Sequence, residues 1–153
     1  MIFSHEKIGW LWMQMQRFRT LFSDITKNDA DNFYNLLILP NSYWIEILDS
    51  ENYIIGVVYV TGMQQVVDAD VHLMFFDRRP AEKVELCKKI AGWLFDTFHF
   101  HRLTATIPMI YYATVRLAEK IGFVHEGRKR QSQLMGSRWV DEVILGLLYS
   151  EVD

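Results

Sequence analysis

Two side chains that can exchange protons stand two positions apart in an extended segment of the sequence. Asp70 and His72 alternate with apolar residues between residues 69 and 76, and this period of two predicts a strand that carries both on one face. The ordinary pKa of histidine lies close to neutrality, so we take His72 as the first candidate for a general base, with Asp70 beside it. The alternative is a half-buried histidine that only bonds a neighbour. Glu46, in an earlier predicted strand, is a third candidate base.

A basic turn follows this strand and leads into a helix. The turn contains Arg78 and Arg79, and an amphipathic helix pattern then runs from about residue 82 to 98. The N-terminus of a helix that follows a strand can hold a phosphate, because free backbone N–H groups and the helix dipole both point there. The sequence therefore places a candidate phosphate site between Arg78 and Lys83.

Other reactive residue types give weaker signals. The single cysteine, Cys87, excludes an internal disulfide and lies on the apolar side of the same helix, which favours a buried thiol over a nucleophile. His99, His101 and His125 have no cysteine or carboxylate partner in a ligand pattern. We therefore expect no metal site.

Length and composition favour one soluble domain over residues 1–153. Of the 153 residues, 50% are hydrophobic and 14% aromatic, which is enough to build a core. The net charge of −3 gives no general attraction to nucleic acid or to an anionic membrane, so we expect neither as a partner. The apolar runs are too short to span a bilayer, and the first residues do not resemble a secretory signal, so we expect a cytoplasmic protein. The many aromatic and methionine residues are compatible with a homodimer.

The hydrophobic pattern predicts the elements that position these residues. Two helices come first, a hairpin of two strands follows, and the strand with Asp70 and His72 comes next. A helix, a strand, a helix and two final strands joined by a polar loop complete the chain. The expected bounds are 6–22, about 26–39, 43–48, 53–61, 69–76, 82–98, 101–107, 111–121, 123–131 and 138–149. A mixed sheet flanked by helices, an α/β architecture, follows from this order.

Three segments, in this order, resemble the GNAT superfamily of acyl-CoA-dependent N-acetyltransferases. The segment from Phe95 to Leu103 is similar to the family's usual approach to its fifth strand, where aromatic residues precede HRL. The segment from Arg116 to Arg128 is similar to the helix-to-strand signature EK-x-GF-x-x-EG. Residues 136–141 are similar to the closing hairpin G-x-W-x-D of the branch that acetylates ribosomal-protein N-termini, polyamines and some antibiotics, with one extra residue between the glycine and the tryptophan. The resemblance covers nearly the whole chain.

This resemblance implies a fold and an activity. The fold is a central, mostly antiparallel sheet of about six to seven strands with about four helices. The activity is the direct transfer of an acetyl group from acetyl-CoA, as co-substrate, to a primary amine of a small molecule or a protein N-terminus. The alternative is a catalytically degenerate GNAT-like domain that binds a protein partner.

The same resemblance locates the pyrophosphate of coenzyme A at a turn of the type Q/R-x-x-G-x-G/A. The matching stretch begins at Phe76, in the Gln/Arg position, and ends at Ala81, which fits; Arg79 occupies the first glycine position. Glycine lets backbone amides approach phosphate oxygens closely. Either Arg78, Arg79 and Lys83 replace those contacts with charge-assisted bonds, or the turn is an exposed charged cap.

The resemblance also implies the remaining site residues. It places the thioester carbonyl against backbone N–H groups around Met74 and Phe75, in the manner of an oxyanion hole. The position of the family's usual tyrosine acid holds Ala118, and the related Asn-x-x-Ser pair corresponds to Tyr111 and Thr114. Their hydroxyl groups are the candidate acids, unless Tyr111 only packs at a helix start. The implied donor-binding residues are Met74, Phe75, Phe76, Arg78, Arg79, Ala81, Glu82, Lys83, Tyr111 and Thr114.

Overall fold

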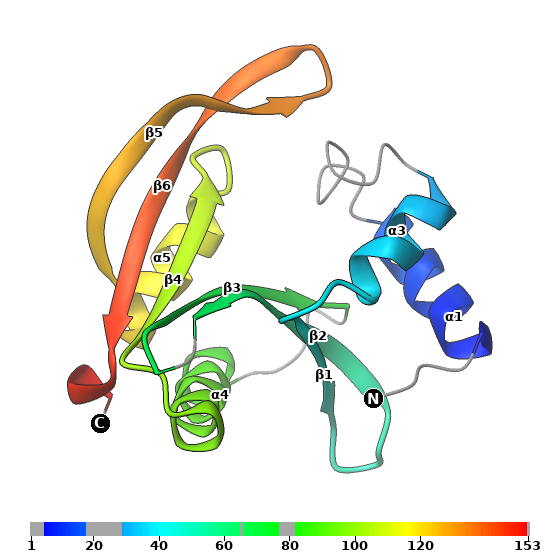
Figure 1. Ribbon diagram of the computed structural model, residues 1–153, viewed down its shortest axis with the longest axis horizontal. Helices are drawn as coiled ribbons and strands as arrows, with labels where there is room; N and C mark the ends of the chain where they lie inside the picture. Colours follow the sequence, from blue (N-terminus) through cyan, green and yellow to red (C-terminus); the bar gives the residue numbers. More distant parts are fainter. Residues whose placement is uncertain (1–4, 18–28, 65, 77–81, 153) are drawn as a thin grey trace.

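The computed structural model, which describes residues 5–17, 29–64, 66–76 and 82–152, is built on one twisted sheet (Figure 1). Its six strands lie in the order β1-β2-β3-β4-β6-β5. Their bounds are β1 (Tyr43–Leu48), β2 (Ile54–Gln64), β3 (Asp68–Phe75), β4 (Arg102–Pro108), β5 (Val124–Met135) and β6 (Arg138–Leu148). Neighbouring strands are antiparallel except β3 and β4, which are parallel. The expected mixed, mostly antiparallel sheet is confirmed.

Two pairs of helices cover the two faces of this sheet (Figure 1). Helices α1 (His5–Gln16) and α3 (Ala30–Leu37) pack on one face, and α4 (Lys83–Phe98) and α5 (Tyr112–Ile121) pack on the other. A short 3-10 helix, η1 (Tyr149–Glu151), follows β6. Within the described ranges, no helix is both long enough and apolar enough to cross a membrane.

The alternation predicted for residues 69–76 decides which core each side chain joins. Ala69, Leu73 and Phe75 pack into the core under α4 and α5. Met74 and Phe76 pack into the core under α1 and α3. Because successive strand residues point to opposite faces, Asp70 and His72 share the α1/α3 face with Met74.

Local signals explain where the helices begin and end. The carboxylate of Asp29 accepts a hydrogen bond from the N–H of Asn32 at 3.0 Å and caps the start of α3. Helix α5 ends at Gly122, which has φ +121° and donates its N–H to the carbonyls of Ala118 and Glu119. Glycine adopts this conformation without a Cβ penalty, so the predicted stop at Gly122 is confirmed.

Three expected elements differ from the observed ones. Strand β2 continues through Gly62 to Gln64, although the sequence predicted its end at residue 61. Helix α1 ends at Gln16 rather than near residue 22, and residues 18–28 lie outside the described ranges. Strand β5 continues to Met135, although the sequence predicted a polar loop after Gln131. Side chains of β6 satisfy the polar groups of this irregular stretch: Asp141 accepts from the N–H of Gln131 at 2.7 Å, and Glu142 accepts from the hydroxyl of Ser132 at 2.8 Å.

The parallel pairing of β3 with β4 is short. It joins residues 68–70 to residues 102–104, and beyond Asp70 the two strands diverge (Figure 1). We call residues 68–70 and 102–104 the joined end, and the separation beyond them the divergence. Leu103 anchors the joined end in the core, because only 1% of its surface is exposed. The sheet therefore opens at its centre.

We expect Leu103→Ala to lower the free energy of unfolding by about 2–5 kcal/mol, because it removes buried methyl groups and leaves a cavity. Leu134→Ala, in the exposed part of the β5–β6 hairpin, is the matched control and should cost about 0.5 kcal/mol or less. Urea unfolding followed by circular dichroism measures both values. Equal losses for the two variants would contradict a core at the joined end.

Candidate active site

The backbone of β3 presents alternate residues to its two neighbours. The N–H of Phe76, the residue after the end of β3, donates to the carbonyl of Ile55 in β2 at 2.8 Å. Since N–H groups of successive strand residues point to alternate edges, the N–H of Met74 also faces β2. Those of Leu73 and Phe75 face β4 instead. Both residues lie beyond the joined end, so β4 does not pair with them.

This alternation refines the predicted carbonyl site. Phe75, named from the sequence, directs its N–H into the divergence, whereas the N–H of Met74 is directed toward β2. Leu73 is the residue that the sequence analysis missed. A single known hydrogen bond between β3 and a neighbouring strand would have identified Leu73, because it fixes toward which edge each N–H group of β3 points. Two N–H groups on one edge of the divergence form a candidate oxyanion site.

His72 is held in a stack of rings on the α1/α3 face. Its imidazole lies 5.7 Å from the ring centre of Tyr59, its partner in β2, and Tyr59 stacks on Trp44 at 4.2 Å. Burial lowers the pKa of His72 to about 4, because the charged imidazolium is poorly solvated there. The ring is therefore neutral at physiological pH. It can accept a proton, but as a weaker base than an exposed histidine.

Asp70 is a half-buried carboxylate on the same face. Burial raises its pKa, the negative charge of Asp68 raises it further, and Lys129 opposes the shift. Among the described residues, the Asp70 carboxylate makes no hydrogen bond or ion pair. Gly62 has φ +59°, and a Cβ at this position would lie 2.9 Å from Asp70 Oδ2, so the glycine leaves room for the carboxylate. Asp70 is suited to hold an ammonium group or to take its proton.

The third candidate base is already paired. Glu46 Oε1 lies 2.6 Å from Lys7 Nζ of α1, and the Glu46 side chain is mostly buried. In the register of the sheet, Glu46 is separated from β3 by the whole of β2. The structure therefore does not bring this carboxylate to the divergence.

The structure divides the candidate donor-binding residues between the two faces, with Met74 and Phe76 under α1 and α3 and Phe75 and Lys83 on the α4/α5 side. Lys83 Nζ sits 5.5 Å from the ring centre of Phe75, a cation–π contact that places a positive charge at the start of α4. Glu82 precedes Lys83 and is exposed, and Phe76 is buried on the opposite face. The remaining turn residues of the prediction, Arg78, Arg79 and Ala81, lie outside the described ranges.

The two candidate acids lie at the start of α5. Tyr111 follows β4, and its carbonyl accepts hydrogen bonds from the N–H groups of Thr114 and Val115 at 2.9 and 3.1 Å. The Tyr111 ring packs against the core under α4 and α5, and Thr114 is exposed. Both residues therefore lie on the same side as Lys83, while Asp70 and His72 lie on the other. The divergence lies between these two groups of candidate residues.

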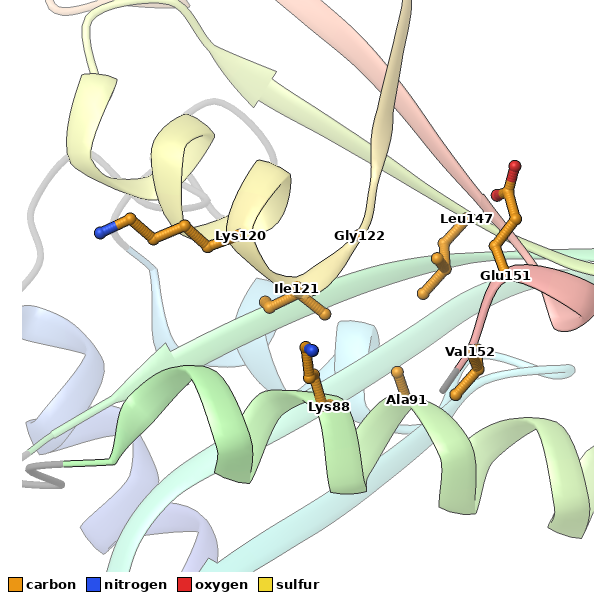
Figure 2. A pocket seen from close by; sticks show the side chains of 8 residues that line it. All are labelled: Lys88, Ala91, Lys120, Ile121, Gly122, Leu147, Glu151 and Val152. Carbon is orange, nitrogen blue, oxygen red and sulfur yellow. The ribbon is translucent and has the colours of Figure 1, made fainter.

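A small hollow of about 90 Å³ lies between α4 and the C-terminal end of α5 (Figure 2). It is bordered by Leu147, which pairs with Leu103, so it lies at the joined end rather than at the divergence. Lys120 and Glu151 also line it (Figure 2), and the Glu151 carboxylate accepts a hydrogen bond from the N–H of Leu148 at 2.9 Å. The hollow does not contribute to the candidate site.

Comparisons with known proteins show the fold. No protein-family model matches the sequence, and no curated protein matches it. Among solved structures, spermidine N-acetyltransferase from Vibrio cholerae in complex with CoA and spermine superposes with a TM-score of 0.84 at 14% identity, over 99% of this chain and 95% of that one. A spermidine N-acetyltransferase SpeG chimera from Vibrio cholerae and hSSAT gives 0.77 at 13% identity, over 98% and 96%. The GNAT-like fold is thus confirmed over nearly the full chain.

The lowered pKa of His72 predicts a loss of stability in acid. Between pH 6.5 and about 4 the unfolded chain binds a proton at this histidine and the folded chain does not, so stability falls as the pH falls. The free energy of unfolding that is lost through His72 is about 3 kcal/mol at most. His72→Phe keeps an aromatic ring on Tyr59 and should flatten this decline, as measured by urea unfolding at several pH values. His125→Gln, at an exposed histidine, is the control; a decline in His72→Phe as steep as in the parent protein would contradict the assignment.

Proposed function

We propose that this protein is an N-acetyltransferase that moves an acetyl group from acetyl-CoA directly to a primary amine. The observation that carries this proposal is the divergence of β3 and β4 beyond Asp70, toward which the N–H groups of Leu73 and Phe75 are directed. An acyl group in this position meets two hydrogen-bond donors where negative charge develops during the reaction.

The donor enters from the α4/α5 side in this proposal. Lys83 supplies a positive charge beside Phe75 at the start of α4, where the free N–H groups of the first helical turn also favour phosphate. The solved structure with CoA and spermine has the same fold, which supports acetyl-CoA as the donor. The residues present fit the pyrophosphate through charge rather than through the usual glycines.

The acceptor amine approaches from the α1/α3 side. Asp70 holds the ammonium and takes one proton from it, or His72 does so from its place two residues along the same face. The neutral nitrogen attacks the carbonyl carbon, and its bond to carbon forms as the bond between carbon and sulfur breaks. We propose a small polyamine as the acceptor class, since a half-buried carboxylate favours a cation and spermine is bound in the structure of the same fold.

The thiolate of coenzyme A leaves on the donor side. A hydroxyl group of Tyr111 or Thr114, directly or through a water molecule, supplies the proton that converts it to the thiol. The attacking nitrogen loses its second proton as the amide forms, and this proton restores the hydroxyl group. An acyl-enzyme on Cys87 is not part of this mechanism. That thiol is buried, and burial raises its pKa to about 11, so the nucleophilic thiolate is scarce at neutral pH.

Binding of the donor is the first test. Acetyl-CoA at about a hundred times its Kd should stabilise the fold by about 2.7 kcal/mol, which raises Tm by roughly 5–10 °C for a domain of this size. Lys83→Ala should weaken binding about fivefold to tenfold in a calorimetric titration, because one phosphate contact is lost. Lys89→Ala, exposed on the same helix, is the matched control and should bind like the parent protein.

Failure of millimolar acetyl-CoA to shift Tm would overturn the proposal. The absence of glycines between Phe76 and Ala81 would then mark a lost donor site. The alternative function, a GNAT-like domain that binds a protein partner, would take its place.

Asp70→Asn separates the reactive role of this carboxylate from its effect on stability. We expect kcat/KM for the amine to fall about 10²- to 10⁴-fold, because the amide cannot take a proton. The folded protein raises the pKa of Asp70, so ionised Asp70 disfavours folding at neutral pH and the variant should have a higher Tm at pH 7. Activity assays and thermal unfolding measure the two effects. Asp96→Asn, exposed on α4, controls for the loss of one negative charge, and unchanged turnover in Asp70→Asn would leave His72 as the base.

A further inference from the structure

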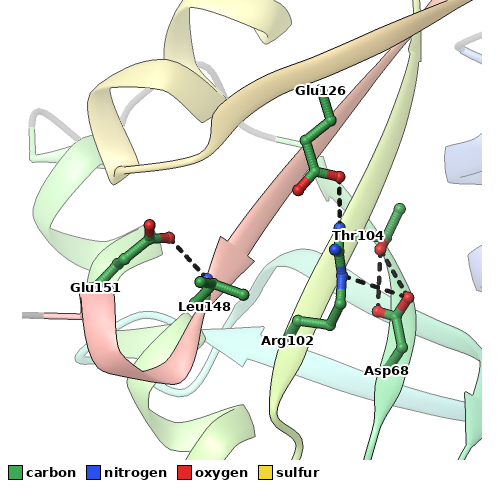
Figure 3. A network of polar contacts seen from close by, with 6 residues as sticks. All are labelled: Asp68, Arg102, Thr104, Glu126, Leu148 and Glu151. Atoms are coloured by element: carbon green, nitrogen blue, oxygen red, sulfur yellow. Dashed lines mark hydrogen bonds and ion pairs between the residues drawn. The ribbon is translucent and has the colours of Figure 1, made fainter.

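Four side chains form a polar network at the joined end (Figure 3). The alternation along β3 places Asp68, and with it this network, on the same face as Asp70. The hydroxyl of Thr104 donates to the carboxylate of Asp68, with distances of 2.9 and 3.0 Å to its two oxygens. Arg102 Nη2 donates to Glu126 Oε2 at 2.6 Å, and Arg102 Nε lies 3.6 Å from Asp68 Oδ2. Two of the residues that pair the backbones of β3 and β4, Asp68 and Arg102, are thus joined again by their charges.

The ion pair between Arg102 and Glu126 spans a strand that contributes no side chain to it. Arg102 belongs to β4 and Glu126 to β5, and β6 lies between these strands. The pair crosses β6 at Gly146, where a Cβ would collide with Arg102 Nη2 and Glu126 Oε1. Glycine at this position is therefore a requirement of the ion pair.

An irregularity in β5 directs the side chain of Glu126 toward Arg102. His125 pairs with Leu145 and Gly127 pairs with Ile144, so Glu126 is an extra residue with none opposite it in β6. A β-bulge of this kind redirects a side chain and increases the local twist. A bulge, a glycine and an arginine from three strands thus converge on one contact.

The network includes the Asp68 carboxylate but not the Asp70 carboxylate. Arg102 has Glu126 as its hydrogen-bonded carboxylate and Asp68 as its second. Asp70 follows Asp68 by two residues on the same face, and within the described part of the chain its carboxylate has no hydrogen bond or ion pair. We propose that Glu126 is a positioning residue: it holds the Arg102 guanidinium away from Asp70, so that the Asp70 carboxylate is left for the acceptor amine. This inference rests on the proposed function.

Loss of Glu126 changes which carboxylate Arg102 meets. Without Glu126, the guanidinium is left with two carboxylates on this face of β3, those of Asp68 and Asp70. A guanidinium that pairs with Asp70 competes with an ammonium for the same oxygens. The acceptor then binds more weakly, while the donor side, on the other face of the sheet, is unaffected.

The kinetic test compares two ion pairs of the same hairpin. Glu126→Ala should raise KM for the amine about tenfold and leave KM for acetyl-CoA unchanged. Arg128→Ala breaks the other pair, Arg128 with Asp141 at 2.7 Å, and should change neither constant. In an Arg102→Met background, Glu126→Ala should have no further effect on KM for the amine, because Glu126 acts through the guanidinium.

A second readout does not need turnover. The carboxyl carbon resonance of Asp70, titrated by NMR, should have a lower midpoint in Glu126→Ala than in the parent protein, because a guanidinium now faces the carboxylate. The charges that already act on Asp70, those of Asp68 and Lys129, are present in both proteins. Glu126→Gln keeps the shape of the side chain and one hydrogen bond, so it should show a smaller shift of the same sign and serves if Glu126→Ala does not fold.

The outcomes separate this inference from the proposed function. A lower Asp70 midpoint with a higher amine KM supports both. A lower midpoint in a protein that acetylates no amine supports the role of Glu126 and overturns the function. An unchanged midpoint, or an equal rise in both KM values, overturns the role of Glu126 whatever the activity.

Discussion

The short parallel pairing of β3 with β4 is the constraint on which the rest of the structure depends. Three residue pairs hold the strands together, and beyond them the backbone of β3 faces the divergence instead of a neighbour. A longer pairing would satisfy the N–H groups of Leu73 and Phe75 and remove the opening. A shorter pairing would leave the two halves of the sheet without backbone hydrogen bonds between them. The core around Leu103 and the charges of Arg102 and Asp68 fix this length from opposite faces.

The candidate site residues are divided between the two faces of the sheet. The α4/α5 side carries Lys83 and Tyr111, and the α1/α3 side carries Asp70 and His72. On the α1/α3 side, burial opposes the ionisation of Asp70 and the protonation of His72, so both groups lower the stability of the fold in their charged forms. Perturbed groups of this kind are typical of functional sites, which are seldom optimised for stability.

Local patterns predicted much of this arrangement, and contacts between distant residues account for what they missed. Period-two alternation placed Asp70 and His72 on one face, and Gly122 ended α5 as expected. The same alternation does not tell which N–H groups face β4, because that depends on a hydrogen bond to another strand. The ion pair of Lys7 with Glu46 joins residues far apart in sequence, and no local sequence pattern predicts it. The donor turn with Arg78 and Arg79 stays a prediction.

The order of the strands also implies an order of assembly. Strands β1, β2 and β3 are consecutive in the chain and pair as neighbours, and β4, β5 and β6 form a second consecutive group. Within each group the pairings are antiparallel. The β1–β2, β2–β3 and β5–β6 pairings join strands that follow one another in the chain, so the loops that must close are short, whereas the β4–β6 pairing closes over α5 and β5. The parallel contact of β3 with β4 is the pairing that requires both groups, with α4 between them. The opening that would hold an acyl group therefore comes into existence when two locally formed sheets meet, and neither of them contains it alone.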